Sequence, residues 1–184
     1  GCEGRFLNAA AVLETELEPG QLLKELHAIE SRHGRVRTAH WSPRPLDMDL
    51  IFFGNHQIET PTLRIPHPAC WYRRFVLDPA CEISEGFRHP RLGPSLSELR
   101  ARLAERPLRI CGAGLRDWPE IFNHPELDPY RSRVCESDPD AARVRFVDTQ
   151  PVGFQIAIPQ AHDVRIRTLI DSLIAMLDEP IPVN

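Results

Sequence analysis

The sequence predicts an α+β protein that combines short apolar strands with amphipathic helices. Runs of strand length stand at 6–15 and 46–53, and apolar residues recur at helical spacing over 20–33 and 163–178. The chain has 184 residues, 42% hydrophobic and 26% charged, so it can bury one sizeable core with an appendage.

The N-terminal half shows a strand, a helix and a second strand. A Pro-Gly pair ends the strand at 6–15, and Gly34 stands where a left-handed residue would end the helix at 20–33. A basic, proline-containing loop at 34–46 leads to the strand at 46–53. The following Gly-Asn turn and the run "QIET" predict a hairpin that pairs back onto this strand.

Farther along, flanking prolines predict an extended loop around His67, and short helices are expected at 73–82 and 96–105. Beyond Pro107, the runs "LRICGAG", "RVRFVDT" and "GFQIAI" predict three strands, and 117–142 is polar and proline-bearing. We therefore divide the chain into residues 1–107 and a C-terminal extension, 108–184, that contains β-strands and the helix at 163–178.

Composition narrows the function classes. A net charge of −4 and a pI near 6.1 give no basic excess for nucleic acid, so no nucleic-acid partner is expected. No apolar run approaches the roughly 20 residues of a membrane span, so no membrane association is expected. Five widely spaced cysteines without a C-x-x-C pair favour a reducing, cytoplasmic environment over disulfides or zinc.

Glu30 stands out on the predicted helix. It follows Leu23 by seven residues and so falls within about 20° of it on the helix wheel, which places a carboxylate on the apolar side. It also lies in the last turn, where the helix dipole disfavours negative charge. An ion pair with Arg32 or Arg35 and a binding role both explain this position.

Asp47 and Asp49 lie one residue apart in the second predicted strand. Alternate side chains of a strand share a face, so the two carboxylates would lie about 6.5 Å apart. Two carboxylates so close repel each other unless a cation lies beside them, and Mg²⁺ favours a few carboxylates plus substrate phosphates. A solvated strand edge is the alternative for this pair taken alone.

The loop before the aspartates strengthens the metal interpretation. Arg35, Arg37 and Arg44 carry guanidinium groups that suit phosphate oxygens, and Trp41 can cover an aromatic ring. The alternative is a solvated charge run anchored by its tryptophan. Paired acids, clustered arginines and an aromatic residue together favour a metal-bound nucleotide polyphosphate.

Four collinear blocks carry a family resemblance over about residues 5–105: "FLNAA", "IESRHGRVR", "HWSPRPLDMDLIFFG" and "IPHPACWYRRFVLDPACEI". In order and spacing they resemble 6-hydroxymethyl-7,8-dihydropterin pyrophosphokinase, a kinase (transferase) of folate biosynthesis. The resemblance implies transfer of diphosphate from ATP to the hydroxymethyl group of the pterin, releasing AMP, with two Mg²⁺ ions. The small-molecule partners it implies are ATP and the dihydropterin.

The resemblance also implies roles for individual residues. It assigns Asp47 and Asp49 to the metal ions, Arg35, Arg37 and Arg44 to catalysis, Glu30, Trp41, His67 and Arg73 to ATP, and Asn8 and Phe75 to the pterin. His67 as a rigid turn and Phe75 as a core residue are the structural alternatives.

The implied fold is a ferredoxin-like βαββαβ core that is N-terminally incomplete, because family members have a strand, a helix and a second strand before the block "FLNAA". Without them, an empty slot separates the strands at 6–14 and 46–53. A segment of the full protein, a strand of the extension such as "LRICGAG" or "RVRFVDT", or a strand donated by a second chain would fill it.

Two functions follow. The first is the pyrophosphokinase reaction, favoured because both aspartates and the loop arginines are present. The alternative is a non-catalytic or incomplete relative that acts as a nucleotide-binding or interaction module. The helix at 163–178 has a mixed polar face, which favours packing or dimer formation through the extension over binding to a membrane surface.

Overall fold

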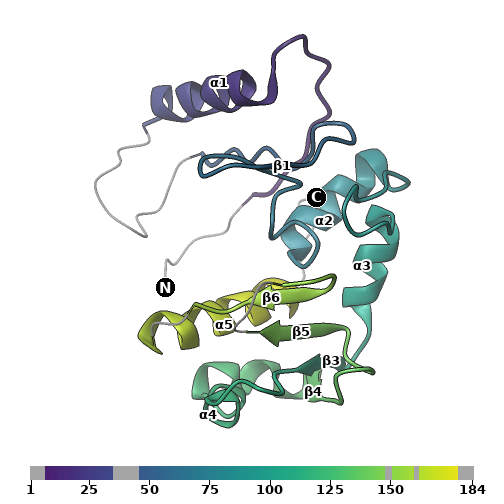
Figure 1. Ribbon diagram of the computed structural model, residues 1–184, viewed down its shortest axis with the longest axis vertical. Coiled ribbons are helices and arrows are strands. Elements are labelled where there is room, and N and C mark those ends of the chain that lie inside the picture. Colours follow the sequence, from purple (N-terminus) through teal and green to yellow (C-terminus); the bar gives the residue numbers. More distant parts are fainter. Residues whose placement is uncertain (1–6, 35–45, 148–150, 160–161, 178–184) are drawn as a thin grey trace.

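The computed structural model describes residues 7–34, 46–147, 151–159 and 162–177. In Figure 1, α1 and the β1–β2 hairpin lie at one end of the molecule, a four-stranded sheet lies at the other, and α2 and α3 lie between them along one side. The elements are α1 (Pro19–Arg32), β1 (Ile58–Glu59), β2 (Arg64–Ile65), α2 (Arg74–Ser84), α3 (Leu96–Ala104), β3 (Leu108–Cys111), α4 (Trp118–Phe122), the 3-10 helix η1 (Pro125–Arg133), β4 (Val134–Glu136), β5 (Val144–Val147), β6 (Gln155–Ala157) and α5 (His162–Leu177).

Helix α1 forms where the leucine spacing predicts it. Pro19 occupies its first turn, where a missing N–H costs nothing, and the side chain of Gln21 accepts the backbone N–H of Glu18 at 3.1 Å. Gly34, with φ +88°, follows the last turn in the left-handed conformation that favours glycine. The buried side chains of α1 include Leu22, Leu26 and Glu30, spaced four residues apart.

The two strands predicted at 6–15 and 46–53 are not strands in the structure. Residues 7–16 and 46–52 have no backbone ladder, and none of the strands in the described part of the chain pairs with either segment. Leu7 and Val12 are consequently among the most exposed large apolar side chains described. The prediction was wrong because a β-strand exists only with a neighbour that pairs its N–H and C=O groups.

The predicted hairpin forms with a different partner. Strand β1, from the run "QIET", pairs antiparallel with β2, in the register Ile58↔Ile65 and Glu59↔Arg64, rather than with 46–53. A tight turn closes this pair, since the N–H of Thr60 donates to the carbonyl of Leu63 at 2.9 Å. Because this turn joins two segments only a few residues apart, the run "QIET" pairs with the strand that follows it rather than with the segment that precedes it.

The C-terminal extension forms a parallel sheet in the order β4-β3-β5-β6. Strands β3, β5 and β6 confirm the three predicted strands, whereas α4, η1 and β4 were missed within the polar stretch 117–142. Neither "LRICGAG" nor "RVRFVDT" fills the predicted slot, because β3 and β5 pair with each other and with β4 and β6. That hypothesis is therefore wrong.

The hydrophobic core includes residues from both halves of the sequence. Helix α2 packs against α3 and α5, and α5 lies along the sheet (Figure 1). Burial of each core side chain contributes about 1.5–3 kcal/mol of transfer free energy. The fully buried side chains of the core include Leu77, Leu99, Leu103, Ile110, Phe146 and Leu173. None of the described helices is both long and apolar enough to cross a membrane.

Candidate functional site

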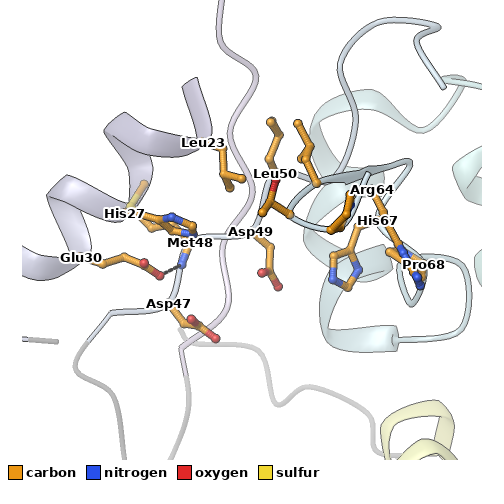
Figure 2. A pocket seen from close by; sticks show the side chains of 13 residues that line it. Leu23, His27, Glu30, Asp47, Met48, Asp49, Leu50, Arg64, His67 and Pro68 are labelled. Atoms are coloured by element: carbon orange, nitrogen blue, oxygen red, sulfur yellow. Dashed lines mark hydrogen bonds between the residues drawn. The ribbon is translucent and has the colours of Figure 1, made fainter. Parts of the chain in front are cut away.

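A cavity of about 420 Å³ lies between α1, the extended segment 46–50 and the loop 61–68. Figure 2 shows its side chains converging from these three parts of the chain. Four of the residues predicted to form the site line it: Glu30, Asp47, Asp49 and His67. The structure therefore brings together a helix residue, two residues of the predicted strand and a loop histidine.

The carboxylate of Glu30 is anchored to the backbone between the two aspartates. Its Oε1 accepts the N–H of Met48 at 2.8 Å, and the side chain is 1% exposed. The bond ties the last turn of α1 to the segment that carries Asp47 and Asp49 (Figure 2). This contact gives a structural reason for a carboxylate on the apolar side of α1, because a buried carboxylate needs hydrogen-bond donors.

Asp47 and Asp49 share one side of the extended segment, as the alternation predicts. Both are exposed and line the cavity, whereas Met48 between them is half-buried. Their carboxylates supply hard oxygen ligands of the kind that Mg²⁺ prefers, and the cavity beside them leaves room for phosphates. In the described part of the chain, no three His, Cys, Asp or Glu side chains form a metal-binding group by themselves.

His67 faces the aspartates from the opposite wall. Its backbone N–H donates to the carbonyl of Ile51 at 2.9 Å, which joins the loop 61–68 to the segment that carries the aspartates. Its Nδ1 accepts the N–H of Ala69 at 3.3 Å. Burial lowers the pKa of His67, the Asp49 carboxylate raises it, and the Arg73 guanidinium lowers it further. The net lowering favours a neutral imidazole.

The remaining predicted site residues lie elsewhere. Arg73 and Phe75 stand at the start of α2, with the guanidinium 5.6 Å from the ring centroid, and neither lines the cavity. Asn8 is exposed in the segment 7–16, also outside the cavity. Four predicted site residues lie outside the described residues: Arg35, Arg37, Trp41 and Arg44.

Sequence reasoning missed two ionisable residues of the cavity, His27 and Arg64. His27 precedes Glu30 by three residues on α1, so the helical spacing that placed Glu30 on this face also places His27 there. Arg64 comes from β2 and is paired with Glu59 at 2.9 Å. No local sequence pattern identified Arg64, because its position at the cavity depends on the turn that folds β2 back onto β1.

Residues 2–85 match the family model described as 7,8-dihydro-6-hydroxymethylpterin-pyrophosphokinase. The 2-amino-4-hydroxy-6-hydroxymethyldihydropteridine pyrophosphokinase of Synechocystis sp. is 45% identical over 94 residues, which are 51% of this chain and 48% of that protein. The protein of the same name from Pseudomonas aeruginosa is 43% identical over 97 residues, 53% of this chain and 59% of that protein. Residues 2–85 are thus similar to this pyrophosphokinase family.

The matched segment, residues 2–85, contains the whole cavity, from Leu23 to Pro68. A pyrophosphokinase of Bacillus subtilis adds a third relative, 41% identical over 83 residues, 45% of this chain and 50% of that protein. The chain thus spans about half the length of the pyrophosphokinases it matches. The β3–β6 sheet and α5 lie outside the matched segment.

Proposed function

We propose that the protein transfers diphosphate from ATP to the hydroxymethyl group of 6-hydroxymethyl-7,8-dihydropterin in folate biosynthesis. The hydroxymethyl oxygen attacks the β-phosphorus of ATP, and the bond from this phosphorus to the oxygen shared with AMP breaks. AMP leaves with the electron pair of that bond, and the hydroxyl proton passes to solvent. One observation carries the proposal: two neighbouring aspartates face a cavity beside a buried glutamate, inside the segment that is similar to the pyrophosphokinase family.

Asp47 and Asp49 are proposed to hold Mg²⁺, with two ions bound. Bound Mg²⁺ would neutralise phosphate charge, which matters because diphosphate transfer depends on positioning and charge stabilisation more than on a strong base. Glu30 holds the backbone of Met48 and so fixes the segment between the two carboxylates.

The other predicted roles are part of the same proposal. The guanidinium groups of Arg35, Arg37 and Arg44 would bind phosphate oxygens in the transition state. Trp41, His67 and Arg73 would contact ATP together with Glu30, and Asn8 and Phe75 would contact the pterin. A neutral imidazole on His67, favoured by burial, carries its proton on Nε2 because Nδ1 accepts the N–H of Ala69, so it would donate one hydrogen bond without adding charge.

The organisation of the chain belongs to the proposal as well. Residues 1–107 would form the pyrophosphokinase unit, in which a ferredoxin-like core would need strand partners for 7–16 and 46–52 that the described residues do not supply. Residues 108–184 would support α2 and α3 through the shared hydrophobic core. The net charge of −4 supports a protein without a nucleic-acid partner, and the free thiols among the described cysteines support a cytoplasmic site of action. A dimer through the extension remains a proposal. The non-catalytic alternative is not favoured, because the relatives are pyrophosphokinases by name.

The test measures AMP formation from ATP and the dihydropterin in the presence of Mg²⁺. Asp47→Asn with Asp49→Asn should reduce turnover by a factor of about a thousand or more, since the metal-bound phosphates lose their protein anchor. Calorimetry with a non-hydrolysable ATP analogue, followed by the dihydropterin, separates nucleotide binding from pterin binding.

The extension supplies a matched control. Asp138 and Asp140 have the same D-x-D spacing and are also exposed, but lie outside the cavity. Asp138→Asn with Asp140→Asn should leave AMP formation unchanged. Equal activity in both double variants would remove the aspartate pair from the mechanism. Nucleotide binding without pterin binding would support the non-catalytic alternative.

A further inference from the structure

A second groove, of about 690 Å³, lies between residues 88–105, which follow the matched segment 2–85, and the C-terminal extension. The loop 88–94 and helix α3 form one side, and Arg143 and Phe154 from the extension form the other. None of the residues that line the 420 Å³ cavity lines this groove. It is therefore a separate site, and its volume falls within the range of small-molecule pockets.

Arg102 is held in place at this groove. Its guanidinium carbon lies 3.8 Å from the centroid of the Phe154 ring, and its Nε donates to the carbonyl of Arg143 at 2.9 Å. The stacking and the hydrogen bond fix the plane of the guanidinium and leave its terminal Nη groups for other partners. Within the part of the chain that the structure describes, no carboxylate forms an ion pair with Arg102.

The acidic side chains of the groove already have partners. Glu105 pairs with both Arg143 and Arg109, and the hydrogen bond from Arg143 lowers the pKa of Glu105. Glu98 accepts the backbone N–H of Ser95 at 2.7 Å as part of the α3 capping box. Neither carboxylate pairs directly with Arg102, and the groove is lined by three arginines and only two carboxylates, which leaves one surplus positive charge.

Burial makes that surplus charge significant. It lowers the pKa of Arg102, and the neighbouring Arg143 lowers it further, whereas Glu105 raises it. Arg102 is half-buried, and a partly shielded guanidinium gains more from an anion than a fully exposed one does, because the surroundings screen the interaction less. The fixed plane also suits two parallel hydrogen bonds to a carboxylate or phosphate.

Apart from Arg88, which pairs with Glu98 at 3.9 Å, the rest of the wall is apolar. Leu92 and Pro94 are half-buried at the groove, and Gly93 between them has φ +92° and no side chain to fill the space. A ligand that consists only of a charged group would leave these apolar side chains exposed to water, whereas a ligand with an additional apolar or flat moiety would cover them.

We propose that this groove binds a small organic anion, whose carboxylate or phosphate group pairs with the Nη groups of Arg102 while its apolar body lies against Leu92 and Pro94. The proposal is independent of the pyrophosphokinase reaction, because it uses no residue of the 420 Å³ cavity.

The test titrates the full chain with phenyl phosphate and with benzoate and follows backbone amide signals by NMR. Saturable shifts are expected at Gly93, Ala101 and Arg102 for at least one of the two probes, and which probe binds tells phosphate from carboxylate recognition. Benzyl alcohol, with the same ring and no charge, should bind at least about tenfold more weakly.

Two variants separate the anion contact from an effect on folding. Arg102→Met should weaken binding about tenfold or more, whereas Arg116→Met, which removes an exposed arginine of the extension, should leave it unchanged. Arg102→Lys keeps the charge but lacks the planar guanidinium group, so it should give intermediate affinity. This variant replaces Arg102→Met in the test if the methionine variant fails to fold. No saturable shift with either probe at millimolar concentration, equal affinity in Arg102→Lys and the parent, or shifts at Leu23 and Met48 instead of Gly93 would overturn the proposal.

Discussion

The side chain of Glu30 and the backbone of Met48 form a hydrogen bond of 2.8 Å across 18 residues of sequence. One partner is in the last turn of α1, and the other stands between the two aspartates that face the cavity. The helix therefore fixes the segment that carries the aspartates through a single buried carboxylate. Although 46–52 has no strand partner in the described structure, this bond, the one between His67 and Ile51 and the packing of Phe52 against Phe87 help to hold it in place.

Glu30→Ala should destabilise the fold and weaken nucleotide binding. The N–H of Met48 loses its acceptor, which costs about 1–3 kcal/mol of unfolding free energy where the group stays shielded from water. Urea denaturation and titration with the magnesium complex of an ATP analogue measure the two effects. Glu30→Gln keeps an acceptor oxygen and should recover most of the stability. Glu25→Ala, at an exposed position of the same helix, is the control, and equal losses in Glu25→Ala and Glu30→Ala would contradict the argument.

His89 should make the stability of the fold depend on pH. The side chain is buried, and its Nδ1 accepts the N–H groups of Arg91 at 3.2 Å and Leu92 at 3.1 Å, so it must be neutral there. Burial lowers its pKa to about 4. Between about pH 6.5 and pH 4 the unfolded chain binds a proton that the folded chain does not. The contribution of His89 is therefore complete above pH 6.5 and is lost as the pH falls to about 4.

Urea denaturation at several pH values across this window tests the effect. His89→Asn places an amide oxygen near the position of Nδ1 and removes the titration, so the decline in unfolding free energy toward pH 4 should become shallower. His56→Asn, at an exposed histidine, should leave the profile of the parent chain. Identical pH profiles for His89→Asn and the parent would rule out His89 as the source.

Local patterns predicted most of the regular structure. Helix α1 follows from the spacing of its apolar residues and the glycine that ends it, and α5 follows from its long apolar stripe. The strands predicted at 6–15 and 46–53 failed because strand formation depends on a partner elsewhere in space. Strand β4 was missed because only three residues, Val134–Glu136, pair within a polar stretch.

In the candidate site, too, local patterns predicted some features and missed those that depend on contacts between distant residues. The alternation along 46–50 predicted that Asp47 and Asp49 share a face, and helical spacing placed Glu30 on the buried side of α1. The acceptor role of Glu30 toward Met48 was not predictable, because no sequence pattern pairs a side chain with a backbone group 18 residues away. The groove at Arg102 was missed for a similar reason, since Phe154 approaches from the extension.

Cys70 should resist alkylation in the folded chain. Burial raises the pKa of its thiol to about 12, so almost none of the reactive thiolate is present near neutral pH. Cys135 is only half-buried and should react first among the four described cysteines. Iodoacetamide labelling followed by mass spectrometry measures the order. Urea should abolish the difference, and labelling of Cys70 as fast as Cys135 in the folded chain would contradict the prediction.

Gly112→Ala should destabilise the extension. A Cβ at this position would lie 2.1 Å from ring atoms of Trp118, far inside van der Waals contact. The ring cannot move away cheaply, because it is buried in the core and its Nε1 donates to Glu136 at 2.7 Å. Overpacking of this kind costs about 1–3 kcal/mol or more, which urea denaturation measures directly. Gly86→Ala meets no atom within 4 Å and should change the unfolding free energy little. A parent-like unfolding free energy in Gly112→Ala would mean that the indole ring repacks and that its bond to Glu136 contributes little to the fold.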